Sequence, residues 1–448
     1  MLKRRRSCLK TRVGLLIALS ILLVVLIFYF TAPDLFELAE LRLLDWRTRL
    51  RGPTDPGRTV KLILIDARSR EHYGMNEDMR FALGGLLSDL CRKGARAIGL
   101  DVFFIPDPGG PADPSRVALA DAIKKCGNVV IGYEWRVDIR KTRLGEAEAV
   151  GRLRLLDATR KPGEKGFTPE DIPEGAEPLD PAIAKNAAAM GFFTVVADPL
   201  NFARKIPATL VHNGNPHYPF SLAVARVFLR QSDYEFPKTV RIPFLGPYLK
   251  GVNLATDPFG YLWLDQYGTA DAFERLSFED AVAHGVPEDF AGGSVILFGV
   301  SGDESNDQFA TMFDPNLPGV VLHATAVANA LSRGFLWRDG LVRGLEVALM
   351  ALCALAMGFL IPRLHPVLSI CLGPALIVIL WLLADRLLGN LGIWIQLLNP
   401  VLLIILVHVG VLTARITVAE RQCARLEAQT EDVRNCSSKK ATIPGEVE

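Results

Sequence analysis

The sequence predicts one α/β domain, with a mixed and largely parallel sheet, on a membrane base of four helices. One long apolar segment precedes residues 32–340 of the 448-residue chain and three follow them. Between these segments, short apolar runs rich in β-branched residues alternate with amphipathic stretches, which is the pattern of parallel β-α-β units. The formal net charge is +1, so the overall charge gives no reason to expect a nucleic-acid partner.

The membrane segments begin with a basic stretch, residues 1–12, followed by an uncharged apolar segment at 13–31. This apolar core is longer than that of a signal peptide, and no small-residue cleavage site follows it, so we expect an anchor rather than a cleaved signal. The other apolar segments lie at 341–361, 367–384 and 393–414. Short links between these three predict antiparallel hairpins.

The distribution of arginine and lysine predicts the topology of the chain. The basic residues at 1–12 favour a cytoplasmic N-terminus. Four spans return the tail, residues 415–448, to the same side, so residues 32–340 are expected outside. We therefore predict a multi-pass protein of a bacterial inner membrane, with both termini in the cytoplasm and lipid as a partner.

The outer domain begins with helical spacing at residues 35–50, which predicts a stalk. Strands are expected at 60–65, 97–104, 128–133, 191–196, 204–211, 240–244, 261–264 and 295–299. Helices are expected at 80–94, 115–126, 182–189, 220–229, 278–283 and 322–331. Residues 135–180 are rich in charge, glycine and proline, and they predict a long surface excursion.

The seven cysteines form no metal-binding pattern. Only Cys91 and Cys126 lie between the outer spans, where a disulfide is one alternative. We favour the other alternative, two free buried thiols that act as small hydrophobic side chains. No phosphate-binding loop, glycine-rich dinucleotide motif or zinc-protease motif occurs, so we expect no cofactor and no metal.

Four acidic residues follow or end apolar strands: Asp66, Asp101, Asp303 and Asp307. The carboxyl ends of parallel strands meet at one edge of a sheet, so these side chains are candidates for binding a cation or a polar ligand. The alternative is that they cap helices or brace loops, since aspartate is a preferred helix cap.

Three basic residues complete the candidate ligand site. Arg80 and Arg204 are candidates for neutralising an anionic ligand, and the alternative is structural pairing with the aspartates. His323 opens the last soluble helix and is a candidate pH reporter, with a core hydrogen bond as its alternative. Residues 299–303 contain a serine but lack the second glycine of a nucleophile elbow, and we identify no catalytic constellation.

Several different short motifs occur, one after another, along residues 34–337. They are Leu44-Asp45-Trp46-Arg47, Leu64-Ile65-Asp66, Ile98-Gly99-Leu100-Asp101-Val102-Phe103-Phe104, Gly127-Asn128-Val129-Val130, Gly191-Phe192, Ile242-Pro243-Phe244, Leu297-Phe298-Gly299, Asp307-Gln308-Phe309 and Pro318-Gly319-Val320. In this order, and with three spans after them, they resemble a CHASE domain of the second type (CHASE2). This family is a bacterial extracytoplasmic sensory module that precedes cyclases and kinases. Residues 415–448 contain no such catalytic domain.

The resemblance implies a transmembrane sensory receptor subunit that reads an extracytoplasmic signal and relays it to a cytoplasmic signalling partner. One alternative is a membrane scaffold whose outer domain docks another envelope protein. Another alternative is an ectoenzyme that uses the strand-end carboxylates and a metal. We favour the sensor over the scaffold and the scaffold over the enzyme.

The tail carries small and apolar residues at alternating spacings of three and four: Ile416, Ala419, Cys423, Leu426, Thr430 and Val433. This spacing is that of a two-stranded coiled coil and predicts a homodimer. An amphipathic end that lies on the membrane is the alternative.

Overall fold

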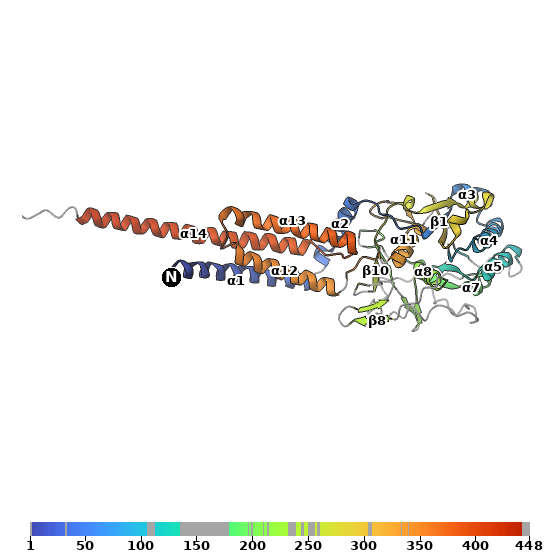
Figure 1. The fold of residues 1–448 in the computed structure, drawn as a ribbon, viewed down its shortest axis with the longest axis horizontal. Coiled ribbons are helices and arrows are strands. Elements are labelled where there is room, and N and C mark those ends of the chain that lie inside the picture. Colours follow the sequence, from blue (N-terminus) through green and yellow to red (C-terminus); the bar gives the residue numbers. More distant parts are fainter. Residues whose placement is uncertain are drawn as a thin grey trace, which may run out of the picture. The chain divides into compact units, whose positions relative to one another are not determined.

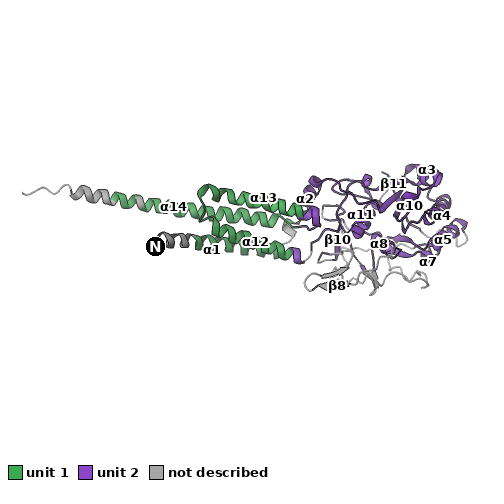
Figure 2. Cartoon of the chain, viewed as in Figure 1, with its two compact units in different colours: residues 1–41, 343–386, 395–448 green, residues 42–342, 387–394 purple. Residues whose placement is uncertain are grey.

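The computed structural model describes residues 2–31, 34–104, 113–134, 179–195, 197–198, 200–208, 210–212, 215–231, 239–242, 246–249, 256–257, 260–302, 307–332, 334–338 and 340–440. The chain divides into two compact units (Figure 2). A membrane unit comprises residues 1–41, 343–386 and 395–448, and an α/β unit comprises residues 42–342 and 387–394. Most of the excursion expected at 135–180 lies outside the described residues.

The α/β unit is built on a six-stranded sheet in which every pairing is parallel (Figure 1). Its strand order is β11 (Glu274–Ser277), β1 (Val60–Ile65), β12 (Val295–Val300), β2 (Ala97–Asp101), β3 (Val129–Tyr133) and β4 (Ala189–Phe192). The inner strands are apolar along almost their whole length because both faces of the sheet are covered. The predicted α/β fold class is confirmed.

Helices cover the two faces of this sheet and divide its core into two clusters. Alternate side chains of β1 point to opposite faces, with Leu62 in one cluster and Ile63 in the other. One face carries α3 (Ala67–Tyr73), α4 (Glu77–Arg92), α5 (Pro114–Cys126), α7 (Pro181–Asn186), α9 (Phe278–His284) and α10 (Glu288–Ala291). The opposite face carries α8 (Phe220–Gln231) and α11 (Gly319–Ser332).

Short antiparallel pairs complete the α/β unit. They are β5 (Lys205–Pro207) with β10 (Tyr261–Trp263), β6 (Leu210–His212) with β7 (Asn215–His217), β8 (Thr239–Ile242) with β9 (Gly246–Leu249), and β13 (Gln308–Phe309) with β14 (Leu317–Pro318). A 3-10 turn at Ala270–Ala272 precedes β11.

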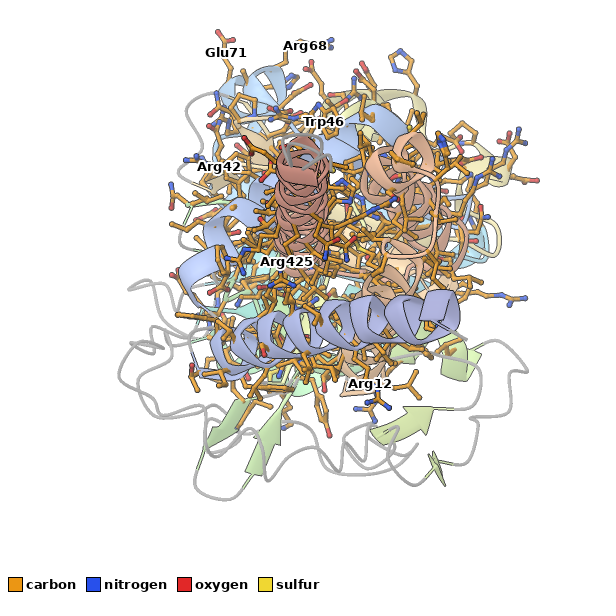
Figure 3. The ribbon with its side chains drawn as sticks, turned by 90° about the vertical axis from the view of Figure 1, so that its left-hand side faces the viewer. Arg12, Arg42, Trp46, Arg68, Glu71 and Arg425 are labelled. Carbon is orange, nitrogen blue, oxygen red and sulfur yellow. A yellow bond between two sulfur atoms is a disulfide. The ribbon has the colours of Figure 1, made fainter. Side chains whose placement is uncertain are left out.

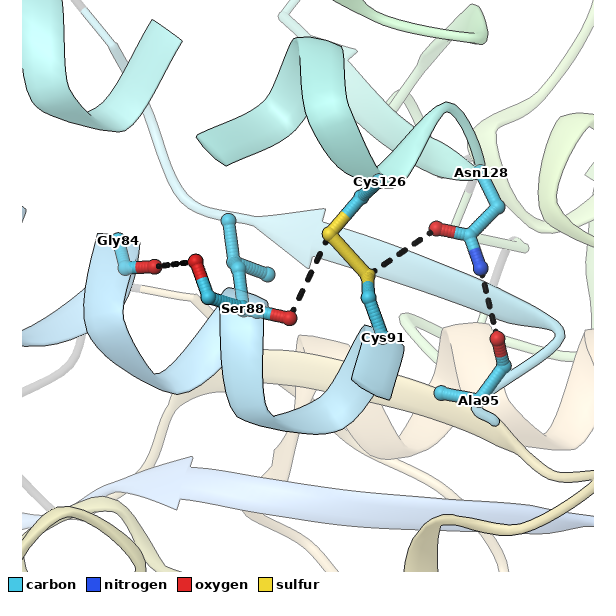
Figure 4. The surroundings of a disulfide bond; sticks show 7 residues. Gly84, Ser88, Cys91, Ala95, Cys126 and Asn128 are labelled. Carbon is cyan, nitrogen blue, oxygen red and sulfur yellow. Dashed lines mark hydrogen bonds between the residues drawn. A yellow bond between two sulfur atoms is a disulfide. The ribbon is translucent and has the colours of Figure 1, made fainter. Parts of the chain in front are cut away.

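The structure joins Cys91 and Cys126 in a disulfide (Figure 4), so the prediction of two free thiols was wrong. The two residues lie in the last turns of α4 and α5, which pack side by side. Their Cα atoms are 5.7 Å apart, within the usual range for a disulfide. Spacing along the sequence did not reveal that the ends of these two helices meet.

Four helices are long and apolar enough to cross a membrane: α1 (Leu2–Thr31), α12 (Gly340–Leu360), α13 (Pro366–Leu391) and α14 (Leu398–Lys440). The expected stalk forms α2 (Asp34–Arg51). Within the membrane unit, α1 and α12 approach closely at two glycines. A Cβ atom on Gly14 would lie 2.6 Å from the carbonyl oxygen of Gly358. Small residues allow such backbone contact between membrane helices.

Candidate ligand site at the carboxyl edge of the sheet

The connections that leave the carboxyl edge of the sheet change direction at β12. The connections after β1 and β2 lead to α3, α4 and α5 on one face, whereas β12 leads to α11 on the other. Strands β12 and β2 are direct neighbours. In open α/β sheets, ligands bind outside the carboxyl ends of the strands at such a switch point.

Two of the predicted acidic residues come together at this switch point. Asp101 ends β2 and is paired in register with Gly299 of β12. A Cβ on Gly299 would collide with Val320, the second residue of α11. A Cβ on Gly319 would collide with the carboxylate of Asp307. The absence of these two Cβ atoms therefore lets the start of α11 and Asp307 close against the edge at Asp101.

Glu134 is a third carboxylate at this edge, and we call Asp101, Glu134 and Asp307 the switch-point cluster. Burial raises the pKa of Asp101 well above its usual value, and the charge of Asp307 raises it further. Burial also raises the pKa of Asp307, and Glu134 adds to this effect. Like charges close together disfavour full ionisation, so Asp101 and Asp307 hold protons more tightly than ordinary aspartates do.

Asp101 is distinctive among these residues. Part of its surface remains exposed, but its Oδ2 atom is buried and has no hydrogen-bond partner. A buried acceptor without a partner is uncommon in native structures and calls for an explanation. It is therefore the strongest indication of a ligand in this part of the chain.

Next to Glu134, the hydroxyl of Tyr133 lies 3.0 Å from Nδ1 of His217. Burial raises the pKa of Tyr133, so the phenol stays neutral at neutral pH. Glu134 and Tyr133 were not among the candidates predicted from the sequence. Glu134 follows β3 as directly as the other candidates follow their strands, so the same strand-end rule applies to it.

His323 lies one helical turn after Gly319 in α11 and is only 4% exposed. Its ring centroid is 5.6 Å from that of Phe193 and 5.3 Å from that of Phe220. Burial lowers its pKa to about 4, so the imidazole is neutral at physiological pH. This aromatic setting does not favour a switch that operates between pH 5 and 8.

Asp66 is the N-cap of α3, the alternative that its sequence position left open. Its Oδ1 atom accepts hydrogen bonds from Ser69 N at 2.9 Å and Ser69 Oγ at 2.7 Å. Burial acts to raise the pKa of Asp66, but the bonds from Ser69 and Ser277 outweigh it and lower the pKa. Asp303, the remaining acidic candidate, lies outside the described residues.

The two arginine candidates form ion pairs with aspartates outside the switch-point cluster. Arg80 Nη2 lies 2.8 Å from Asp113 Oδ2, at the N-cap of α5. The buried Arg204 donates to both oxygens of Asp45, on α2, at 2.9 and 2.6 Å. Arg204 also pairs with Asp198. Each arginine therefore joins two segments of the fold through an ion pair.

Among the described residues, no group of three or more His, Cys, Asp or Glu side chains is arranged to hold a metal ion. The family model for the CHASE2 domain matches residues 20–360, which is more than half of the chain. The chain belongs to the CHASE2 family. In the same comparisons, no curated protein and no solved structure matched. A CHASE2 domain is a sensory rather than a catalytic module, and here it is part of a protein with four candidate membrane spans.

Proposed function

We propose that this CHASE2 protein detects an extracytoplasmic signal and relays it through α14 to a cytoplasmic signalling partner. The proposal rests on one observation: residues 387–394 belong to the same compact unit as the sensory domain, residues 42–342 (Figure 2). These residues are the end of α13 and the first part of the link to α14. The rest of α13 and all of α14 belong to the membrane unit. A rearrangement of the sensory domain is therefore passed along the chain directly to the start of α14.

Two tryptophans build this connection into the sensory domain. Trp337 N donates to Gly392 O at 2.7 Å, and Trp394 N donates to Trp337 O at 3.0 Å. The Trp394 ring is buried, with its centroid 4.8 Å from that of Trp263 in β10. The guanidinium of Arg338 lies 4.8 Å from the centre of the Trp394 ring. These contacts hold the link before α12 and the link before α14 together.

The same small region of the sensory domain also holds α2. Arg204, which pairs with Asp45 of α2, directly precedes β5, the partner of β10. Arg51 at the end of α2 forms two hydrogen bonds, 3.1 and 2.6 Å long, with Asp265 just after β10. The β5–β10 pair thus connects to the segments that lead to α1, α12 and α14, which supports its role in transmission.

Within the membrane unit, buried carboxylates hold the first residue of α14 and the chain just before it. Glu346 of α12 accepts from Gln396 N at 2.7 Å and from the hydroxyl of Tyr29. Glu40 of α2 accepts from Leu398 N. Carboxylates at a helix N-terminus satisfy free N–H groups and favour the positive end of the helix dipole. The start of α14 is thus fixed within the membrane unit as well.

The test uses the full chain in lipid nanodiscs, with a nitroxide on Cys423 and serine at the other cysteines outside the disulfide. Thermal-shift screening identifies a compound that stabilises the outer domain. The electron paramagnetic resonance spectrum of the nitroxide is then recorded with and without this compound. We expect the label's spectrum to change on binding. Trp394→Ala should keep the thermal shift and lose the spectral change, because the connection to α14 is weakened.

The matched control is Trp46→Ala, since Trp46 is 52% exposed on α2. This variant should keep both the thermal shift and the spectral change. A spectral change that persists in Trp394→Ala would show that the signal does not travel through the 387–394 connection. If only a protein from the envelope stabilises the domain, the scaffold alternative replaces the sensor.

A further inference from the structure

We propose that the switch-point cluster binds a small organic ammonium ion, with Asp101 and Asp307 as its counter-charges. This inference rests on the proposed sensory role and names the chemical class of the ligand. It starts from the position of the cluster, at the neighbouring strands where the connections diverge to opposite faces of the sheet.

The contacts along this edge bring two carboxylates to one place. Asp101 is in register with Gly299, on which Val320 packs, and the adjoining Gly319 packs on the carboxylate of Asp307. Both glycines are positions where a side chain would push α11 or Asp307 away from the edge. The close approach is therefore built into the sequence at two separate residues.

The second observation is the buried Oδ2 atom of Asp101, which has no partner. An unmade hydrogen bond at a buried acceptor is costly, and the cost is larger for a charged group. An ammonium N–H would supply both the missing donor and the opposite charge. A ligand of this kind therefore removes the defect at the switch point.

The charges around the cluster favour a cation over an anion. Arg80 pairs with Asp113, and Arg204 pairs with Asp45 and Asp198, so neither of these predicted anion ligands supplies positive charge to the cluster. Besides the cluster itself, the described titratable or charged groups on the surrounding elements include Asp66, Tyr133, His217, His323, Arg226 and Arg70. Arg70 Nη2 lies 3.3 Å from a Cβ built on Gly302, in the loop after β12.

Neighbouring aromatic rings favour an organic cation over a metal ion. Phe103, two residues after Asp101, is 45% exposed, and its ring centroid lies 5.4 Å from that of Phe193. Aromatic rings attract ammonium groups, and they offer nothing to an ion that needs oxygen ligands. The described residues also contain no group of three side chains arranged for a metal.

The experiment measures binding of putrescine and ethanolamine, two amines whose ammonium groups carry N–H donors, to the full chain in nanodiscs, by isothermal titration and thermal shift. Ca²⁺, Mg²⁺ and inorganic phosphate are the comparison probes. We expect at least one amine to bind and raise the melting temperature of the outer domain. Binding should weaken as the pH falls and should release protons, because a protonated carboxyl must ionise to pair with the amine.

Asp101→Asn should weaken amine binding at least tenfold and abolish the proton release, since the substitution keeps the size of the side chain and removes its charge. Gly319→Ala should also weaken binding, because the new Cβ displaces Asp307. Asp121→Asn, at an exposed position of α5, is the matched control and should bind as the wild type does. Circular dichroism of each unliganded variant checks that the domain is folded.

Amine binding that survives Asp101→Asn in the folded variant overturns the assignment of the site. Binding of Ca²⁺ or Mg²⁺ alone, lost in Asp101→Asn, overturns the ligand class, as does stabilisation by phosphate alone. The relay is tested separately by the label on Cys423. An amine that binds through Asp101 without changing the label's spectrum supports this inference and contradicts the proposed relay.

Discussion

At the scale of single residues, the buried charged groups of the sensory domain are of two kinds. The first kind has an ion-pair partner, and the second has a buried atom without a hydrogen-bond partner. Arg204 shows the first, since this 1% exposed guanidinium has two carboxylate partners from different segments. Removing one partner of such a buried pair costs about 3–5 kcal/mol. Asp101 shows the second, because its Oδ2 atom has no partner. The first kind joins separate segments of the fold, whereas we propose that the unpaired oxygen of Asp101 pairs with a ligand.

His323 gives a prediction about pH. Its folded pKa of about 4 lies below the ordinary value of 6.5, so the unfolded chain takes up a proton first as the pH falls. Its contribution to stability is therefore complete above pH 6.5 and is lost as the pH falls toward 4. The loss is about 3 kcal/mol, at 1.36 kcal/mol per unit of pKa difference.

The measurement is urea unfolding of the outer domain of the full chain in detergent, between pH 4 and 7. His323→Phe keeps an aromatic ring in the aromatic cluster and should flatten the rise in stability over this range. His284→Gln, at an exposed position, should leave the profile unchanged. An unaltered profile in His323→Phe would mean that the imidazole is already protonated near its ordinary pKa.

At the scale of elements, the sequence predicted those parts whose burial determines their composition. The strand expected at 295–299 is β12, an almost wholly buried run at the centre of the sheet, and the strand expected at 60–65 is β1. The edge strand β11 was missed because Glu274 and Arg275 are exposed and give no apolar pattern. Helix α3, with seven mostly polar residues, was missed for the same reason.

The position of Asp101 and Asp307 after apolar strands made them candidates from the sequence, but the sequence could not show which strands are neighbours. Strand β12 comes late in the chain and inserts between β1 and β2. This insertion brings Asp307 to Asp101, while Asp66 caps a helix instead. The pairing of Arg204 with Asp45 likewise depends on contacts between segments 159 residues apart in the chain.

The disulfide between α4 and α5 gives a prediction about stability. The bonded cysteines are separated by 35 residues, and closing a loop of this length stabilises a fold by about 3–4 kcal/mol in the chain-entropy account. Replacing both Cys91 and Cys126 by alanine should lower the free energy of unfolding by about that amount. Chemical denaturation of the outer domain in the full chain measures it.

A reducing agent supplies the control for this experiment. It should destabilise the wild-type domain and leave the doubly substituted variant unchanged. A wild-type domain that is insensitive to reduction, and that reacts with a thiol reagent when unfolded, would show that the two cysteines are free in the native protein.

At the scale of the whole molecule, α14 is the element best suited to carry a signal away from the sensory domain. It runs without a break from Leu398 to Lys440, so its last 26 residues extend about 39 Å beyond the predicted fourth span. Arg415 near the end of that span donates to Ile361 O at 2.7 Å and to Ser369. From residue 419 to 431 the described side chains are largely exposed and many are charged, among them Arg425 (Figure 3).

The last prediction concerns the partner of this exposed helix. Ile416 is 51% exposed and begins the three-four spacing that continues through Ala419 and Cys423 to Val433. An apolar stripe on a continuous helix is stabilised when a second copy packs against it, and a paired rod transmits rotation better than a single helix. We therefore expect a homodimer in which the two Cys423 side chains lie close together.

Oxidative crosslinking in membranes tests this expectation. The Cys91–Cys126 disulfide is kept, and Cys8, Cys353, Cys371 and Cys436 are replaced by serine. We expect a disulfide-linked dimer through Cys423, and a Cys423→Ser variant that carries a new cysteine at Arg421 should crosslink less, because position 421 lies off the seam. Dimers detected by other means without a Cys423 product would move the interface elsewhere. The tail would then be a docking segment for a cytoplasmic partner.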